Sequence, residues 1–225
     1  MADIYIETGR SMSTFPGEET RLLAGRVRGL LEANADRLQF HGWRHTNFVR
    51  RKAAEFAEKR CADTRLVEAA ALVHDLNYVI EADSSPDAGR TMRAALLTEC
   101  GFSGEDIKRI EAMIVGAHTE WRQRHVDVET ACLSDADTLY KALPITPVLF
   151  SHKYLSENRV ALSDLAKKIV NEQADKLAED YYFYDDDVSE RYGHWAQANL
   201  QLWEAVLESL DDPDVVELVE GESLT

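Results

Sequence analysis

Five ionisable side chains fall on the inward faces of helices that the sequence predicts. They are His45, His74, Asp75, His118 and Asp137. Four of them stand three, four, eight or eleven residues from apolar residues of the same segment, and such spacings put side chains on one side of an α-helix. Asp75 follows His74 directly, at the end of its helix. Burying charge without a partner is costly, so converging imidazoles and carboxylates favour a divalent transition metal: Mn, Fe, Co, Ni or Zn.

The segment SDADTL holds two aspartates, and helical phase separates them. Asp137 is four residues after Leu133 and lies about 40° from the same line, whereas Asp135 is about 200° away. We therefore expect Asp137 to face the metal. We expect Asp135 to point elsewhere, or to cap the helix if the helix begins just after it.

Each of these residues also has an ordinary interpretation. A single histidine on an apolar face is more often a hydrogen-bonded core residue, and a single aspartate at a helix end is usually a cap or a dipole partner. The agreement of the whole set favours the metal. The remaining histidines considered, His41, His125 and His194, are assigned to surface or capping positions.

The elements that must position these residues are all helices. Apolar residues recur at helical spacing from residue 18 to 210, and no alternation typical of strands follows residue 10. The predicted fold class is therefore all-α. The expected helices cover about 18–38, 44–60, a segment capped by Asp63, one from Ser85–Pro86 to Gly101, one from Ser103, then 129–142, 163–184 and 188–210. Pro144 and Pro147 are expected to break the chain, which divides it into a metal-binding core, 18–145, and a C-terminal helical extension, 146–225, within one globular unit.

Composition excludes several classes of protein. The chain has 225 residues, 45% of them hydrophobic, which rules out an intrinsically disordered chain. The net charge of −16 disfavours sequence-independent binding of nucleic acid. The apolar runs are short, so we expect no membrane span and no secretory signal. Three scattered cysteines argue against a disulfide framework and predict a cytoplasmic protein.

The order His45, then His74–Asp75, then Asp137 resembles the H…HD…D signature of the HD phosphohydrolase superfamily. The surrounding segments are similar as well, over about residues 20–145: HGWRHTNFVRRKAAEFA, RLVEAAALVHDLNY, GFSGEDIKRIEAMIVGAHTE and LSDADTLYKAL. The resemblance implies a helical bundle of the HD type with His45, His74, Asp75 and Asp137 as metal ligands. Members with two metals have further histidines where this chain has Ser84, Ser85 and Asp87, so the resemblance implies a single metal, with His118 or Asp87 left as candidates to help hold a second ion.

The resemblance also implies an activity, the metal-dependent hydrolysis of a small phosphorylated metabolite or a nucleotide. In this interpretation the metal acts as a Lewis acid and activates water. Asp75, as a ligand, and His118, as a proton donor or phosphate contact, serve catalysis. Lys141 and Arg44 are candidate phosphate contacts, and Arg122 and Arg124 are candidates in a loop.

Two other functions stay open. Some members of the superfamily are di-iron oxygenases, although they use more histidines than this chain offers. A regulatory or binding module with an inactive site is the other alternative, and its support is the C-terminal third, to which no family chemistry attaches. The stripe that carries Trp195 and Trp203 is either core or the face of a homodimer formed through the C-terminal helices.

Overall fold

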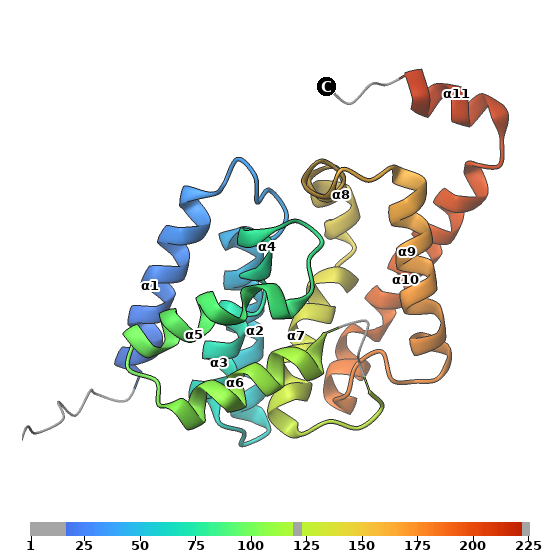
Figure 1. Ribbon diagram of the computed structural model, residues 1–225. Helices are drawn as coiled ribbons and strands as arrows, with labels where there is room; N and C mark the ends of the chain where they lie inside the picture. Colours follow the sequence, from blue (N-terminus) through green and yellow to red (C-terminus); the bar gives the residue numbers. More distant parts are fainter. Residues whose placement is uncertain (1–16, 119–122, 222–225) are drawn as a thin grey trace, which may run out of the picture.

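The computed structural model describes residues 17–118 and 123–221, and within these ranges the chain is all-α with no strand, which confirms the predicted fold class (Figure 1). The elements are α1 Glu18–Ala33, α2 Trp43–Lys59, α3 Thr64–Val73, α4 Asn77–Ile80, the 3₁₀ turn η1 Pro86–Gly89, α5 Arg90–Glu99, α6 Gly104–Ala117, α7 Val128–Ala142, α8 Ile145–Asn158, α9 Leu162–Ala178, α10 Asp186–Ser209 and α11 Pro213–Gly221.

Helix α3 is the centre of the bundle. It packs against α1, α2, α6 and α7, and every apolar residue from Leu66 to Val73 is buried. A helix that is apolar on all sides is stable only when other helices cover all of its faces. The C-terminal end of α3 therefore delivers the residues that follow it, His74 and Asp75, into the interior.

Local signals in the sequence set several helix starts. The carboxylate of Asp63 accepts a hydrogen bond from the backbone N–H of Leu66 at 3.2 Å, as the predicted N-cap of α3. Ser103 begins α6 with a capping box, in which its hydroxyl accepts from the N–H of Asp106 and the Asp106 side chain accepts from the N–H of Ser103. Gly101 ends the preceding helix region at φ +96°, a conformation that other residues rarely adopt.

Other boundaries differ from the prediction. Pro144 does separate two helices, but Pro147 lies in the first turn of α8, where a backbone N–H has no partner within the helix to lose. The expectation that Pro147 breaks the chain is therefore wrong. The helix expected over 163–184 ends at Ala178, and the one expected from Ser85–Pro86 begins as the 3₁₀ turn η1.

The C-terminal helices share the core of the molecule. Tyr182, Phe183, Val188, Tyr192 and Ala196 belong to the main buried cluster, beside residues of α2, α3 and α7. A smaller cluster joins α9 to α10 through Leu165, Ala166 and Trp203. Trp203 is 4% exposed, so this tryptophan is a core residue, while a homodimer through these helices stays a prediction.

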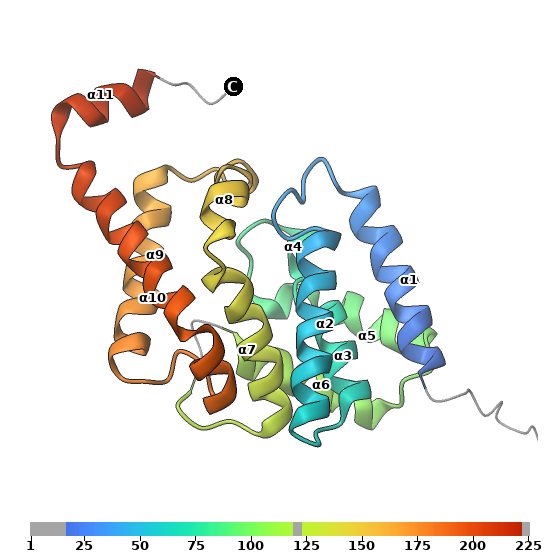
Figure 2. The ribbon, with the colours of Figure 1, turned by 180° about the vertical axis from the view of Figure 1, so that it is seen from behind.

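Helix α11 extends away from the other helices in both views (Figures 1 and 2). Across the described ranges, no helix is both long and apolar enough to cross a membrane.

A buried arginine holds the turn between α4 and α5. Arg93 is fully buried, and its guanidinium donates two hydrogen bonds to the carboxylate of Glu111 on α6, at 2.7 and 2.5 Å. A third hydrogen bond runs from Arg93 to the backbone carbonyl of Pro86 at 2.8 Å. Because the side chain is enclosed and multiply bonded, it fixes the position of η1 against α6.

Candidate metal centre

Three central helices bring the predicted ligands together. His45 is in the first turn of α2, His74 follows the last residue of α3, and Asp137 lies in the middle of α7. Helices α2, α3 and α7 are mutual neighbours in the bundle. Residues 29 to 92 positions apart in the sequence therefore meet at one point.

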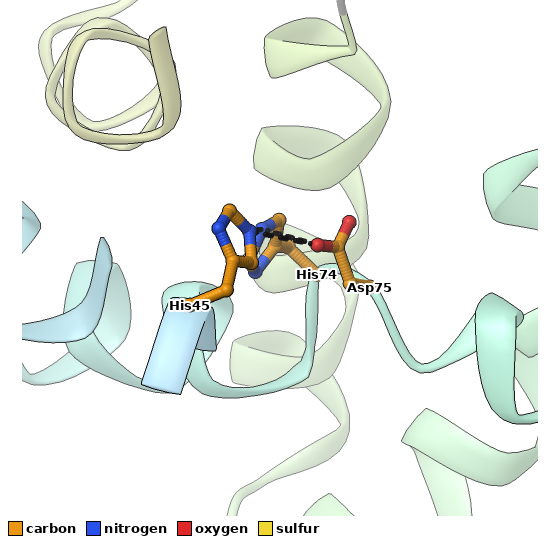
Figure 3. Close-up of side chains that lie close together, drawn as sticks. All are labelled: His45, His74 and Asp75. Atoms are coloured by element: carbon orange, nitrogen blue, oxygen red, sulfur yellow. Dashed lines mark hydrogen bonds and ion pairs between the residues drawn. The ribbon is translucent and has the colours of Figure 1, made fainter. Parts of the chain in front are cut away.

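The ligand atoms of His45, His74 and Asp75 form a tight triangle (Figure 3). The two imidazole Nε2 atoms are 3.2 Å apart. The Oδ2 atom of Asp75 lies 2.9 Å from Nε2 of His45 and 3.1 Å from Nε2 of His74. Asp137 adds a fourth atom, since its Oδ1 lies 3.5 Å and 3.9 Å from the same two nitrogens.

Hydrogen bonds alone do not account for this triangle. Its three edges are all within hydrogen-bond length, yet the corners carry at most two hydrogens, one on each Nε2. Ligand atoms about 2.1 Å from a common ion lie roughly 3.0–3.4 Å from one another, for octahedral and tetrahedral angles respectively. The three separations within the triangle, 2.9, 3.1 and 3.2 Å, are close to that range, while those of Asp137 are longer. The donor set therefore suits a divalent transition metal that accepts imidazole and carboxylate ligands.

A hydrogen bond to the backbone fixes the orientation of the His74 ring. Its Nδ1 lies 2.8 Å from the backbone carbonyl of Ala71, so Nδ1 carries the hydrogen and Nε2 faces the cluster. This arrangement, with the distal nitrogen donating to a carbonyl, is the usual support of a metal-ligating histidine. His45 is 1% exposed, and its Nδ1 makes no hydrogen bond within the part of the chain that the structure describes.

Burial and charge act in opposite directions on the two imidazoles. Burial lowers the pKa of His74, but the charge of Asp75, its hydrogen bond and the charge of Asp137 outweigh burial and raise that pKa to about 9. Burial also lowers the pKa of His45, and there the same carboxylates offset it only partly. In the metal-free protein, one proton is therefore held mainly on His74.

The carboxylates stay ionised against the effect of burial. Burial raises the pKa of Asp75, but the charge of His74 and the hydrogen bonds from both imidazoles hold that pKa well below its ordinary range. Burial likewise raises the pKa of Asp137, but the charges of Lys141, His45 and His74 together outweigh burial and lower that pKa. The cluster is therefore prepared to accept a cation.

Asp137 and Asp135 point to opposite sides of α7, as their helical phase predicts. The second oxygen of Asp137, Oδ2, pairs with Nζ of Lys141 at 2.8 Å. Asp135 is fully buried on the other side, where its two oxygens accept hydrogen bonds from the backbone N–H groups of Tyr184 and Asp185 at 2.8 and 3.0 Å. Because α7 begins at Val128, Asp135 does not cap it, and it anchors the start of α10 instead.

The cluster opens into a cavity of about 330 Å³. His74, Asp75 and Asp137 form part of its wall, and the rest comes from the segment before α2, the α4–η1 segment, the end of α6, and α7 to α10. His118, which directly follows α6, lines this cavity as its predicted inward position requires, and so does Lys141. The ligand motif and the C-terminal helices therefore line the same cavity.

Other predicted contacts lie elsewhere. Arg44 is exposed and is not among the residues that line the cavity, so its position does not support the phosphate contact predicted for it. The reason is its place next to His45 on a helix, because adjacent residues point about 100° apart. Arg124 is exposed and pairs with Glu179. Arg122 lies outside the described residues.

A second buried histidine was assigned wrongly to the surface. His41 is 6% exposed, stacks on Tyr78 with ring centroids 3.7 Å apart, and lines the cavity. Its Nδ1 lies 2.5 Å from Oε1 of Glu157, and Oε2 of the same carboxylate accepts from the N–H groups of Phe40 and His41 at 2.7 and 3.2 Å. His41 precedes α2 and so has no helical phase, and its partner is 116 residues away, so no local pattern signals this pair.

Comparison with known proteins yields a likeness of fold. The chain is similar to the crystal structure of Bacillus subtilis YpgQ, with a TM-score of 0.56, 20% sequence identity, and coverage of 86% of this chain and 97% of YpgQ. No protein-family model matches the sequence. No curated protein matches it either. At this identity the likeness extends to the arrangement of the helices.

Proposed function

We propose that this chain is a metal-dependent phosphohydrolase that acts on a small phosphorylated metabolite or a nucleotide. The observation that carries the proposal is the convergence of two imidazoles and two carboxylates in a cluster that opens into a cavity, beside the ammonium group of Lys141. The resemblance of these residues to the H…HD…D signature supports the same function. A divalent metal, when bound there, supplies Lewis acidity and makes water a better nucleophile near neutral pH.

The remaining steps belong to residues of the chain. The carboxylate of Asp137 holds the ammonium of Lys141 at the edge of the cluster, where that charge attracts a phosphoryl oxygen. His118 lies on the cavity wall, within the same space, and is the candidate to protonate the leaving oxygen. The side chains of Asp137 and His118 are partly shielded from solvent by the cavity walls, so charges there act more strongly than they would in solution.

The thiols support a cytoplasmic location. Cys61, Cys100 and Cys132 are all free, and Cys100 and Cys132 are buried. Unpaired cysteines are typical of a reducing environment, so we place this activity in the cytoplasm.

Elemental analysis of the purified protein, followed by a phosphatase screen, tests the proposal. The screen covers nucleotides and sugar phosphates with Mn, Fe, Co, Ni and Zn. We expect about one metal ion per chain and phosphate release that a chelator abolishes. Iron together with consumption of oxygen would favour the oxygenase alternative. A protein that binds none of these metals would refute the proposal and favour a regulatory module.

The variant His74→Ala tests whether metal binding can be lost while the helical fold is kept. We expect it to remove most of the bound metal and to leave the helical circular dichroism signal unchanged, because α3 is stabilised by its apolar residues. Full retention of metal by this variant would contradict the site assignment.

A further inference from the structure

Helix α9 forms one side of the cavity, although it contributes nothing to the ligand cluster. Its residues Leu165, Lys168, Ile169, Glu172 and Gln173 all line the cavity. They recur at intervals of three or four residues, so they form one continuous face of the helix. Helix α10 packs against α9, which holds this face in place.

Charged side chains of alternating sign line the cavity from the cluster outward. Lys141 pairs with Asp137 at the cluster, as described above. Glu172 interacts electrostatically with both Lys141 and Lys168. Lys168 in turn lies 3.6 Å from the carboxylate of Asp83, at the exposed end of the cavity. Each ammonium therefore already faces carboxylates: Lys141 faces Asp137 and Glu172, and Lys168 faces Glu172 and Asp83.

The side chain of Gln173, on the same face of α9, gives independent evidence for a bound molecule. Gln173 is 7% exposed, and its side-chain oxygen Oε1 has no hydrogen-bond partner among the described residues. Leaving a buried polar atom unpaired is unfavourable, by about 1–3 kcal/mol. A bound molecule that donates a hydrogen bond to Oε1 removes this penalty.

We propose that the α9 face binds the organic part of the substrate, and that this part is an uncharged group bearing hydroxyl or amide hydrogen-bonding functions. The inference rests on the proposed function, because it takes the phosphoryl group to bind at the metal cluster. A second phosphoryl group would bring negative charge next to Glu172 and Asp83, whose lysines are already paired. A purely alkyl group would leave Oε1 of Gln173 buried without a hydrogen-bond partner.

Binding of uncharged probes to the metal-free protein tests the inference without any catalysis. The probes are uridine, which offers amide and hydroxyl functions, myo-inositol, which offers hydroxyls alone, and cyclohexanol as a largely apolar comparison. Trp203 lines the cavity, so intrinsic tryptophan fluorescence reports occupancy. We expect saturable binding of uridine or myo-inositol and much weaker binding of cyclohexanol.

Gln173→Leu is the informative variant, and Gln201→Leu, at an exposed position of α10, is its matched control. We expect Gln173→Leu to weaken binding of the preferred probe about five- to tenfold, the usual effect of one hydrogen bond, and Gln201→Leu to leave it unchanged. Absence of binding by both polar probes, or equal binding by both variants, would overturn the inference.

A kinetic comparison completes the test in the metal-loaded enzyme. We expect kcat/KM for a monophosphate to exceed that for the diphosphate of the same organic group by at least about tenfold. Glu172→Gln removes a negative charge that faces Lys141 and Lys168. We expect this variant to lower the ratio of the two kcat/KM values and to leave the metal content unchanged. Preference of the wild type for the diphosphate would refute the inference alone. Absence of hydrolysis of every phosphoester would refute the proposed function, while the probe-binding result still decides the inference.

Discussion

Substitution of each aspartate of α7 by asparagine separates metal binding from stability. Asp137 offers Oδ1 to the cluster, 3.5 Å and 3.9 Å from the nitrogens of His45 and His74. Asparagine keeps the shape but removes the negative charge. Since loss of a residue that merely supports a ligand weakens metal affinity about 10- to 100-fold, we expect Asp137→Asn to weaken it about 100-fold or more.

Asp135→Asn should act on stability instead. The carboxylate of Asp135 accepts hydrogen bonds from two backbone N–H groups, those of Tyr184 and Asp185, and it is fully buried. Asparagine has one oxygen, so one N–H would face an NH₂ group and lose its acceptor. We expect the free energy of unfolding to fall by about 2 kcal/mol. For a chain of this size that lowers Tm by about 4–8 °C.

The assay measures two quantities on each variant. Metal affinity is measured by titration with Zn²⁺ or Mn²⁺, and Tm is measured by circular dichroism with chelator present, so that metal does not contribute to stability. Each variant is the control for the other, because they differ only in which side of one helix loses a charge. If Asp135→Asn abolishes metal binding and Asp137→Asn does not, the assignment of Asp137 to the metal-facing side of α7 is wrong.

Three further predictions follow from particular contacts. The pKa of His74 is about 9, so below that pH the metal must displace a proton from its imidazole. We therefore expect metal affinity to rise about tenfold per pH unit between pH 6.5 and 8. Calorimetric titrations that show no such rise and no proton release would contradict the assigned protonation. Arg93→Ala removes the buried partner of Glu111 and should cost about 3–5 kcal/mol in urea unfolding, and a loss below 1 kcal/mol would show that the pair is dispensable. Glu157→Gln replaces one carboxylate oxygen and weakens the bond to His41, so the free energy of unfolding should fall by about 2 kcal/mol, and an unchanged urea midpoint would exclude this role.

Local pattern was sufficient for most of the helices and for the phase of the site residues on them, although it did not predict α8. The capping residues Asp63 and Ser103 start helices as expected, because a cap acts on backbone groups two or three residues away. The inward direction of His45 and of Asp137 follows from the 3.6-residue period alone. Such information is contained within one or two helical turns, so it can be read without knowing which helices pack together.

Tertiary packing decided the rest of the site. The pairing of His41 with Glu157 joins residues 116 positions apart, and no local pattern links the two. The position of α9 beside the cluster depends on α10 and on the buried contacts of Trp203. Helical phase predicts which side of α9 faces inward. Only the assembled bundle determines that this side lines the same cavity as His74 and Asp137. The reason is that the position of α9 depends on long-range apolar contacts rather than on neighbouring residues.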